Sequence, residues 1–179
     1  MAAEKDYVSH YQSPLGDLTM ASDGQRLVGL WFDGQKYFGH QLHREHEECP
    51  DLPVFDDTRR WLDLYFDGRP PSFTPALRLR CSGFRRRVSE ILLTIPYGQT
   101  MTYGAISCII ARERGLSTMS AQAVGGAVGH NCISLIIPCH RVIGHHGQLT
   151  GYAGGIERKR HLLMMEQTFC RLHLTNQNQ

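Results

Sequence analysis

A cysteine, a histidine and an arginine directly follow an apolar run that ends in a proline: Leu135–Ile137, Pro138, Cys139, His140 and Arg141. A cysteine thiolate is a strong nucleophile, and a histidine nearby can accept its proton. The apolar run predicts a buried strand, which should end at Pro138 because proline cannot donate to a sheet. We therefore expect Cys139 to be rigidly held but reachable. The alternative is that Cys139 only completes the core, as most cysteines do.

Direct proton transfer between Cys139 and His140 is not favoured, because adjacent side chains of an extended chain point to opposite sides. A bridging water is a better route for the proton. A carboxylate could then orient the imidazole. Glu166 is the best candidate, since residues 76–179 contain only four acidic residues. The alternative for Glu166 is a surface salt bridge.

Three helices are predicted ahead of this segment. Apolar residues recur at helical spacing over residues 84–95, and Thr102 is placed to cap a helix from Tyr103 to Arg112. A third helix is expected from Ser120 to Val128. The last two helices and their glycine-containing turn indicate a helix-turn-helix. The third helix consists almost entirely of small residues, which suits either a tight helix contact or a nucleic-acid groove.

The first part of the chain predicts a small antiparallel sheet and one helix. Alternating or apolar strands are expected at residues 7–11, 18–22 and 27–32, and a helix at residues 56–66. The composition changes near residue 76. We therefore expect a structural domain over residues 1–75 and a second domain over residues 76–170.

Two further expectations concern the remaining segments. A last helix should begin at Ile156 and end near Glu166, with residues 171–179 forming a disordered tail. His40, His43 and His46 are spaced by three in a polar segment. Two of them could share a metal ion, but no paired cysteines accompany them, so a solvated helix or loop is favoured and no metal site is predicted.

Charge and cysteine content restrict the class of protein. Residues 1–75 hold 7 basic and 13 acidic residues, a net charge of −6, whereas residues 76–179 hold 12 and 4, a net charge of +8. This asymmetry suggests that the second part meets a polyanion, although solvated surface charge would look the same. The six cysteines form no Cys-x-x-Cys motif, and no membrane span or secretory signal is evident. We expect a soluble protein of a reducing, intracellular compartment.

The segment from Ile137 to Val142 resembles the active-site motif of the O6-alkylguanine-DNA alkyltransferases, also called methylated-DNA–protein-cysteine methyltransferases. Further matches follow in the family's order: Pro96-Tyr97-Gly98, Thr102-Tyr103-Gly104, Ala123-Val124-Gly125-Gly126, Asn131, Gly151-Tyr152-Ala153-Gly154-Gly155, and Leu162-Leu163 with Glu166. The resemblance covers residues 84–166 closely and Ser13-Pro14-Leu15-Gly16 more loosely.

The resemblance implies a mixed α/β (α+β) fold. It consists of a ribonuclease-H-like N-terminal sheet with a helix, then a helical domain with a helix-turn-helix and an active-site strand or turn. It implies DNA repair in which Cys139 takes an alkyl group from O6 of guanine, or O4 of thymine, and keeps it. The target base must be flipped out of the duplex, because a thiol cannot reach O6 inside the stack. A monomer bound through the minor groove is expected, with no cofactor, in the cytoplasm or in a eukaryotic nucleus.

The resemblance also assigns roles to individual residues. A relay would run from Glu166 through His140 and a water to Cys139, while Asn131 braces the preceding turn. Tyr103 would rotate the target phosphate and help to protonate the leaving guanine. The guanine pocket would be formed by the backbone carbonyls of Cys139 and Val142, the side chain of Tyr152 and the backbone of Ala153. The residues expected to contact DNA are Thr102, Tyr103, Gln122, Ala123, Gly125, Gly126 and Arg141.

Two departures from the family pattern bear on DNA handling. The family often has an arginine before Ala-Val-Gly-Gly, where this chain has Gln122, so base flipping should be weaker or differently assisted. Cys132 replaces the proline that commonly follows Asn131. A non-catalytic binder of alkylated DNA is the main alternative function, although such relatives lack the cysteine, and a cysteine hydrolase is a weaker one.

Overall fold

The computed structural model describes residues 5–81 and 83–176, and the chain divides into two compact units. The first unit extends to Arg80 and also includes Cys132–Ile136. The second unit consists of Cys81–Asn131 and the chain from Ile137 onward. The expected domains, 1–75 and 76–170, divide the chain a few residues earlier and do not include this return to the first unit.

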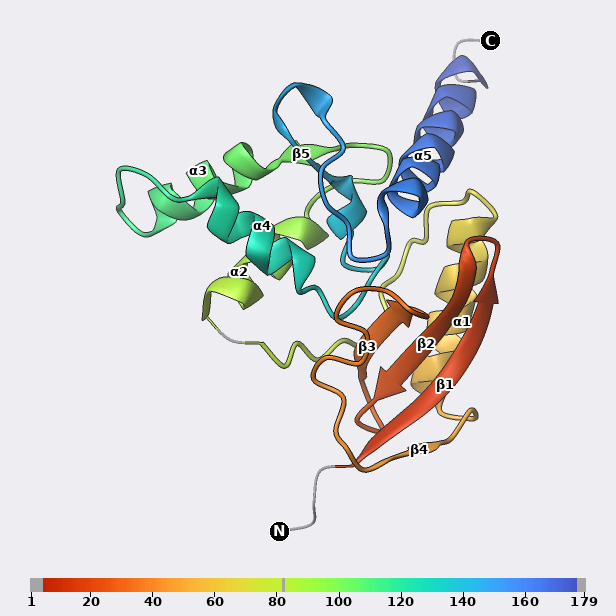
Figure 1. Cartoon of the computed structure of the whole chain (residues 1–179). Helices are drawn as coiled ribbons and strands as arrows, with labels where there is room; N and C mark the ends of the chain where they lie inside the picture. Colours follow the sequence, from red (N-terminus) through yellow and green to blue (C-terminus); the bar gives the residue numbers. More distant parts are fainter. Residues whose placement is uncertain (1–4, 82, 177–179) are drawn as a thin grey trace. The chain divides into compact units, whose positions relative to one another are not determined.

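A four-stranded sheet forms the first unit, with strand order β3-β2-β1-β4 (Figure 1). Strands β1 (Asp6–Ser13), β2 (Gly16–Ser22) and β3 (Leu27–Phe32) form the predicted antiparallel meander. Strand β4 (His46–Glu48) pairs in parallel with β1 and was not expected. All three of its residues are exposed, so it has no apolar alternation to reveal it.

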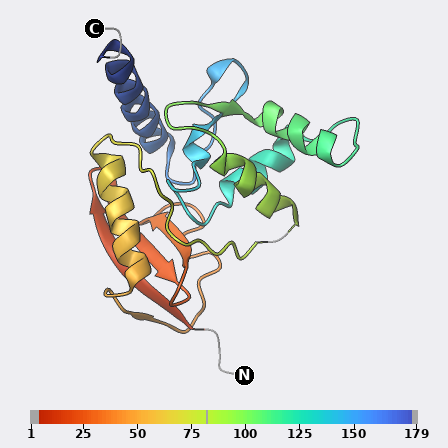
Figure 2. The same cartoon turned by 180° about the vertical axis from the view of Figure 1, so that it is seen from behind.

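Helix α1 (Pro53–Phe66) packs on this sheet, as Figure 2 shows from behind. Phe55, Leu62 and Tyr65 are fully buried and lie at helical spacing, which explains why the sequence predicted this helix. The helix starts three residues earlier than expected, with proline in its first turn, where a missing N–H costs nothing.

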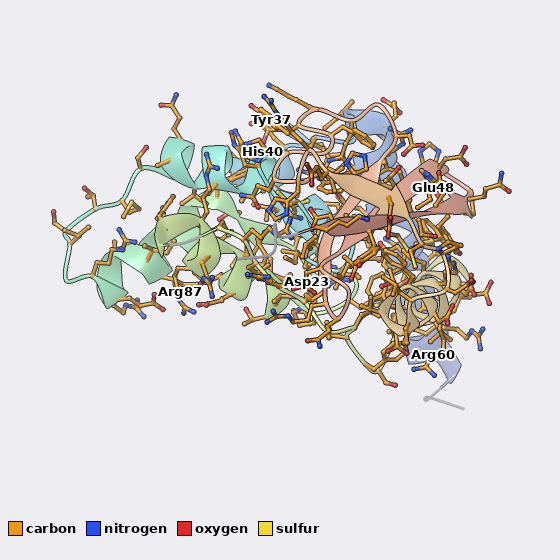
Figure 3. The ribbon with its side chains drawn as sticks, turned by 90° about the horizontal axis from the view of Figure 1, so that it is seen from below. Asp23, Tyr37, His40, Glu48, Arg60 and Arg87 are labelled. Carbon is orange, nitrogen blue, oxygen red and sulfur yellow. The ribbon has the colours of Figure 1, made fainter. Side chains whose placement is uncertain are left out.

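The histidines of the polar segment have separate protein contacts. The ring of His40 meets that of Tyr37 at a centroid distance of 6.5 Å, and Figure 3 shows these two side chains close together. His43 donates its backbone N–H to the buried carboxylate of Asp6 at 2.8 Å, and the ring of His46 contacts the His43 carbonyl. Within residues 5–81 and 83–176, no group of three His, Cys, Asp or Glu side chains is placed to hold a metal ion.

Three short helices build the core of the second unit, and their prediction is confirmed. They are α2 (Gly83–Leu93), α3 (Tyr103–Glu113) and α4 (Ala121–Gly129). Thr102 and Ser120 cap α3 and α4 by accepting backbone N–H bonds. The exposed guanidinium of Arg87 (Figure 3) ties α2 to Glu113 at the end of α3.

Helix α5 (Ile156–Asn176) is longer than predicted. The expected end near Glu166 is wrong, and residues 171–176 are helical; residues 177–179 of the expected tail lie outside the described residues. No proline or glycine occurs between Glu166 and Asn176, so nothing in the backbone stops the helix. Cys170 also contacts the carbonyl of Tyr97, which holds this part of the helix to the unit. No helix in the described ranges is long and apolar enough to span a membrane.

The expected strand at Leu135–Ile137 is also wrong, because these buried residues form a turn. Ile133 makes a single bridge to Leu30 of β3, after which the chain reverses. The N–H of Ile136 bonds to the carbonyl of Ser134 at 2.8 Å, and Leu135 between them has φ +68°. This is a γ-turn, a rare and strained arrangement for a bulky residue. Burial of the apolar side chains is therefore achieved without a sheet ladder.

A second γ-turn leads into the cysteine. Pro138 has φ −81° and ψ 64°, and the N–H of Cys139 bonds to the carbonyl of Ile137 at 2.8 Å. These angles are those of the inverse γ-turn, which proline favours through its fixed φ. Cys139–Arg141 then form a short 3-10 helix, η1. The following strand β6 (Val142–Ile143) pairs in parallel with β5 (Met101–Thr102).

Candidate active site

Cys139 is buried, with 4% of its surface exposed, so the expectation of a solvent-reachable thiol is wrong. The side-chain amide of Asn131 donates to its Sγ at 3.1 Å and to the carbonyl of Ile137 at 2.9 Å. Asn131 thus links the end of α4 to the turn that carries the cysteine. The resemblance predicts that Asn131 braces this turn, and these two hydrogen bonds are the contacts through which it would do so.

Burial raises the pKa of the Cys139 thiol above its ordinary value. The Asn131 hydrogen bond, the positive charge of Lys159 and the backbone N–H groups of Cys139 and His140 act in the opposite direction. The raised pKa keeps the resting thiol protonated at neutral pH. A reaction at Cys139 therefore needs a route that removes this proton.

The Glu166 carboxylate is fully buried on α5 and accepts hydrogen bonds from four donors. They are His140 Nε2 at 2.7 Å, Arg141 Nε and Nη2 at 2.9 and 3.1 Å, and the Gly98 N–H at 2.9 Å. Burial alone would raise the pKa of Glu166, but the hydrogen bonds from His140 and Arg141 and the positive charge of Arg141 outweigh it and lower the pKa to about 2. Glu166 is thus a buried anion, and the surface salt bridge considered for it is excluded.

His140 has no exposed surface, and burial lowers the pKa of its imidazole despite the attraction of Glu166. The ring is therefore neutral at pH 7 in the resting protein. Cys139 and His140 lie in η1 rather than in extended chain, so the alternation of side chains that we expected of an extended chain does not apply to them. The ring is nevertheless directed to Glu166, which orients it and would stabilise it after proton uptake.

Arg141, expected to contact DNA, is placed inside the protein instead. It is 8% exposed, and its guanidinium bonds to Glu166 and, at 2.7 Å, to the carbonyl of Ile95. A guanidinium held in this way neutralises the buried carboxylate and has no reach to a phosphate outside. Arg141 is therefore a structural partner of Glu166, and its assignment to the DNA contacts is withdrawn.

Lys159 is a buried cation that sequence reasoning missed. Its Nζ is surrounded by three carbonyls, those of Val142 at 2.5 Å, Thr150 at 2.9 Å and Gly151 at 3.2 Å. Burial lowers the pKa of Lys159 to about 8, while the nearby Cys139 acts to raise it. Lys159 ties β6 to the loop that follows and places a positive charge near the thiol. It is the one lysine after residue 36, a signal that composition alone could have given.

The expected guanine-pocket residues lie close to this network. The Val142 carbonyl bonds to Lys159, and the Cys139 carbonyl accepts the N–H of Val142, so each keeps one lone pair for a ligand. Tyr152 is partly buried, its hydroxyl has no hydrogen-bond partner among the described residues, and burial and Cys139 raise its pKa. Ala153 is also partly buried.

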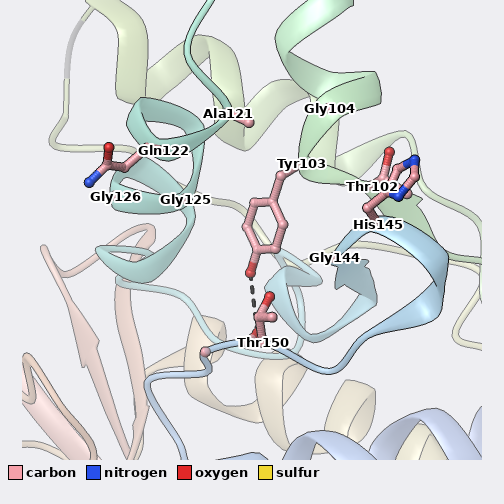
Figure 4. Close-up of a pocket in the computed structure, with 11 residues that line it drawn as sticks. Thr102, Tyr103, Gly104, Ala121, Gln122, Gly125, Gly126, Gly144, His145 and Thr150 are labelled. Atoms are coloured by element: carbon pink, nitrogen blue, oxygen red, sulfur yellow. Dashed lines mark hydrogen bonds between the residues drawn. The ribbon is translucent and has the colours of Figure 1, made fainter.

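A groove of about 880 Å³ lies beside α4, lined by residues of α3, α4 and the loop after β6. Figure 4 shows the ring of Tyr103 in the middle of the groove, between Gln122 and His145. The Tyr103 hydroxyl donates to the carbonyl of Thr150 at 3.4 Å, which bridges the groove. Burial raises the pKa of Tyr103, so the hydroxyl keeps its proton at neutral pH. Of the expected DNA contacts, Thr102, Tyr103, Gln122, Gly125 and Gly126 line the groove, whereas Ala123 is exposed on α4 without lining it.

The small residues of α4 are not required by packing inside the unit. A Cβ added at Gly126 would meet no atom within 4 Å, and one added at Gly125 would only touch the Tyr103 ring at 3.8 Å. Contact with α2 and α3 is made by the other face, where Val124 and Val128 are buried. Of the two interpretations left open by the sequence, the geometry favours close approach of an external partner along this groove.

Two family models match nearly the whole chain. The ribonuclease-like domain of 6-O-methylguanine DNA methyltransferase matches residues 7–80, and the DNA binding domain of the same protein matches residues 83–168.

Individual relatives agree with the family models. The methylated-DNA–protein-cysteine methyltransferase of Mycobacterium tuberculosis is 43% identical over 169 residues, which are 93% of this chain and 97% of that protein. The protein of the same name from Haemophilus influenzae is 36% identical over 90% of this chain and 86% of its own. The crystal structure of M. tuberculosis OGT in complex with DNA superposes with a TM-score of 0.77 at 40% identity, covering 92% of this chain and 94% of that one. The chain belongs to the 6-O-methylguanine DNA methyltransferase family.

Proposed function

We propose that this protein repairs alkylated DNA by transferring an alkyl group from O6 of guanine, or O4 of thymine, to Cys139. The observation that carries the proposal is the arrangement around the thiol. Cys139 is held by Asn131, lies next to the neutral His140, and His140 is backed by the buried anion Glu166. Such a set of groups can remove a proton from a thiol and hold the resulting charge.

The transfer follows from these groups. The thiol proton of Cys139 passes through a water to His140, and Glu166 stabilises the imidazolium that forms. The thiolate then attacks the alkyl carbon, so that an S–C bond forms as the C–O6 bond breaks and its electron pair leaves with the guanine. Tyr103, protonated at neutral pH, supplies a proton to the departing base. The thioether is not hydrolysed, so each molecule acts once, and no cofactor takes part.

The groove beside α4 is the proposed surface for duplex DNA. Its glycines leave room for close approach, as a minor-groove binder needs, and it is lined by α3 and α4, two consecutive helices that pack on each other as expected for a helix-turn-helix. The target base must leave the stack to approach a cysteine as deeply buried as Cys139. We propose that a monomer performs this reaction inside the cell, in keeping with its six free cysteines.

Mass spectrometry after incubation with a duplex containing O6-methylguanine tests the function. We expect the protein to gain the mass of one methyl group per molecule, with the modification on Cys139 and none in a Cys139→Ser variant. An unmodified protein that still binds the duplex would instead identify a non-catalytic binder. Product formed in excess of protein would indicate a cysteine hydrolase.

Gln122 lines the groove where related proteins often have arginine, and it lacks a cationic planar head group. We expect Gln122→Arg to raise the rate of alkyl transfer several-fold on duplex DNA but not on the free O6-alkylguanine base. The two rates, measured side by side under single-turnover conditions, check this. Equal effects on both substrates would contradict a role of residue 122 in flipping the base. Gln122→Lys is a matched control that adds charge without the planar group.

A further inference from the structure

The groove beside α4 has no permanent positive charge in its lining. None of its lining residues is Lys, Arg, Asp or Glu; apart from His145, only Tyr103 can titrate. The Nζ of Lys159 lies 6.0 Å from the centre of the Tyr103 ring, but it is buried and bonded to the carbonyls of Val142, Thr150 and Gly151. DNA carries a dense array of phosphate charges, and binding it normally requires cations at the surface. A side chain at this groove that can become positively charged would therefore contribute more to DNA binding than the same side chain elsewhere on the surface.

Two exposed histidines lie at the rim of the groove. His145 lines it, and the ring centroid of His146 is 3.8 Å from that of His145 in an edge-to-face arrangement. Figure 4 shows the imidazole of His145 near Thr102, on the side of Tyr103 opposite to Gln122. Histidine is the side chain that ordinarily changes charge between pH 5 and 8.

The loop that carries the two histidines is closed by its own backbone. The N–H of Gly144 bonds to the carbonyl of Gln148 at 2.7 Å, and the N–H of Gly147 bonds back to the Gly144 carbonyl at 3.3 Å. His146 has φ +59°, a left-handed conformation that is uncommon for a residue with a side chain. This turn packs the two rings against each other, so both rings project from the same hydrogen-bonded turn.

We propose that His145 and His146 bind a phosphate of the DNA backbone at the rim of the groove, and that their protonation adjusts the affinity for DNA. The proposal rests on the proposed function, in which duplex DNA occupies this groove. A phosphate next to two imidazoles stabilises the protonated rings and accepts their N–H bonds, so binding takes up protons. Neutral rings can still donate hydrogen bonds but contribute no charge. DNA affinity should therefore fall as pH rises through the range in which histidine loses its proton.

The test is the dissociation constant of an unmodified DNA duplex between pH 5.5 and 8.5 at constant ionic strength, measured by fluorescence anisotropy. For the natural chain we expect binding to be roughly three- to tenfold tighter at pH 6 than at pH 8. At pH 6 the slope of log affinity against log salt should be steeper by about 0.9 for each phosphate neutralised. Both differences should disappear in the double variant His145→Gln, His146→Gln, whose thermal unfolding is measured to verify that it is folded.

Two other histidines of the second unit provide controls. His161 is exposed on α5, where its ring contacts the Glu157 carbonyl, and His161→Gln should keep the full pH dependence. His130 follows α4, and its ring contacts the Gly126 carbonyl. Loss of the pH dependence in His130→Gln, or its persistence in the double variant, would overturn the proposal. Methyl uptake by Cys139 is measured in parallel: no uptake is a failure of the proposed function, whereas uptake with pH dependence unchanged by the double variant is a failure of this inference alone.

Discussion

Replacing Glu166 by glutamine should lower the free energy of unfolding by about 3–5 kcal/mol, which is the usual cost of breaking a buried ion pair. The variant leaves Arg141 with 8% of its surface exposed and without a counter-charge. Glutamine also presents an NH₂ group toward donors that require an acceptor. Urea denaturation at pH 7 measures the loss.

The same variant should change how stability depends on pH. The pKa of Glu166 is lowered from 4.5 to about 2 in the folded protein, so its stabilising contribution is complete above about pH 4.5 and is lost as pH falls through 2. The pKa of His140 is lowered from 6.5, so acid also destabilises the fold by favouring the protonated, unfolded form. Glu166→Gln should therefore show a shallower loss of stability between pH 4.5 and 2 than the natural chain.

Alkylation kinetics separate a catalytic role of Glu166 from a structural one. Without the carboxylate, the imidazolium of His140 is less stable, so the Cys139 thiolate should form only at higher pH. The pH profile of Cys139 alkylation, measured with the free O6-alkylguanine base as alkyl donor, should shift to higher pH. Glu157→Gln is the control on the same helix, since Glu157 pairs at the surface with Arg160 and should contribute less than about 1 kcal/mol. A loss of stability with an unchanged alkylation profile would mean that Glu166 supports only the fold.

The elements that the sequence predicted well are those determined by local chemistry. Helices α3 and α4 begin where Thr102 and Ser120 cap them, and α1 buries residues at helical spacing. Both features are readable from neighbouring residues. The β1–β3 meander is equally local, because short turns join its strands.

The elements that the sequence predicted poorly depend on contacts between residues that are far apart in the chain. Leu135–Ile137 consists of strand-forming residues, yet Ile133 already bridges to Leu30 and the chain turns before a strand can form. The apolar run indicates only that these side chains are buried. A strand and a turn can both bury them, so the pattern does not distinguish the two structures. Strand β4 depends on its pairing with β1, about 40 residues earlier, since its own residues have no apolar alternation.

The residues of the candidate site also divide into those that local sequence signals predict and those whose position depends on contacts far apart in the chain. Cys139 and His140 stand out as a motif, and the scarcity of acidic residues after residue 76 points to Glu166. The placement of Arg141 could not be predicted, since an arginine beside a reactive cysteine suits an external phosphate as well as an internal carboxylate. Only the position of Glu166, 25 residues later on α5, decides between them. The position of Lys159 could not be predicted for the same reason, because its carbonyl partners lie in two segments, β6 and the loop after it, 8 to 17 residues earlier in the chain.

Replacing Lys159 by methionine should slow the alkylation of Cys139 at pH 7 by about tenfold or more, because the pKa of the thiol should rise and less of it would be ionised. The ammonium group of Lys159 lowers the pKa of Cys139 against the effect of burial. Methionine fills a similar volume without charge, so the thiolate loses this support. The carbonyls of Val142, Thr150 and Gly151 also lose their shared donor, which loosens the loop beside the groove.

The charge of Lys159 also predicts a pH dependence of stability and of alkylation that disruption of the loop alone would not produce. Its pKa is lowered from 10.5 to about 8, so the unfolded chain binds more protons than the folded one between these values, and the natural chain should become more stable as pH rises from 8 to 10.5. Lys159→Met should abolish that rise and move the alkylation profile to higher pH. Arg160→Met removes one positive charge from the exposed face of α5 and should change neither. If Lys159→Met slowed alkylation equally at every pH, the buried ammonium would serve only to hold the loop, and the thiolate would owe its formation to His140 and Glu166 alone.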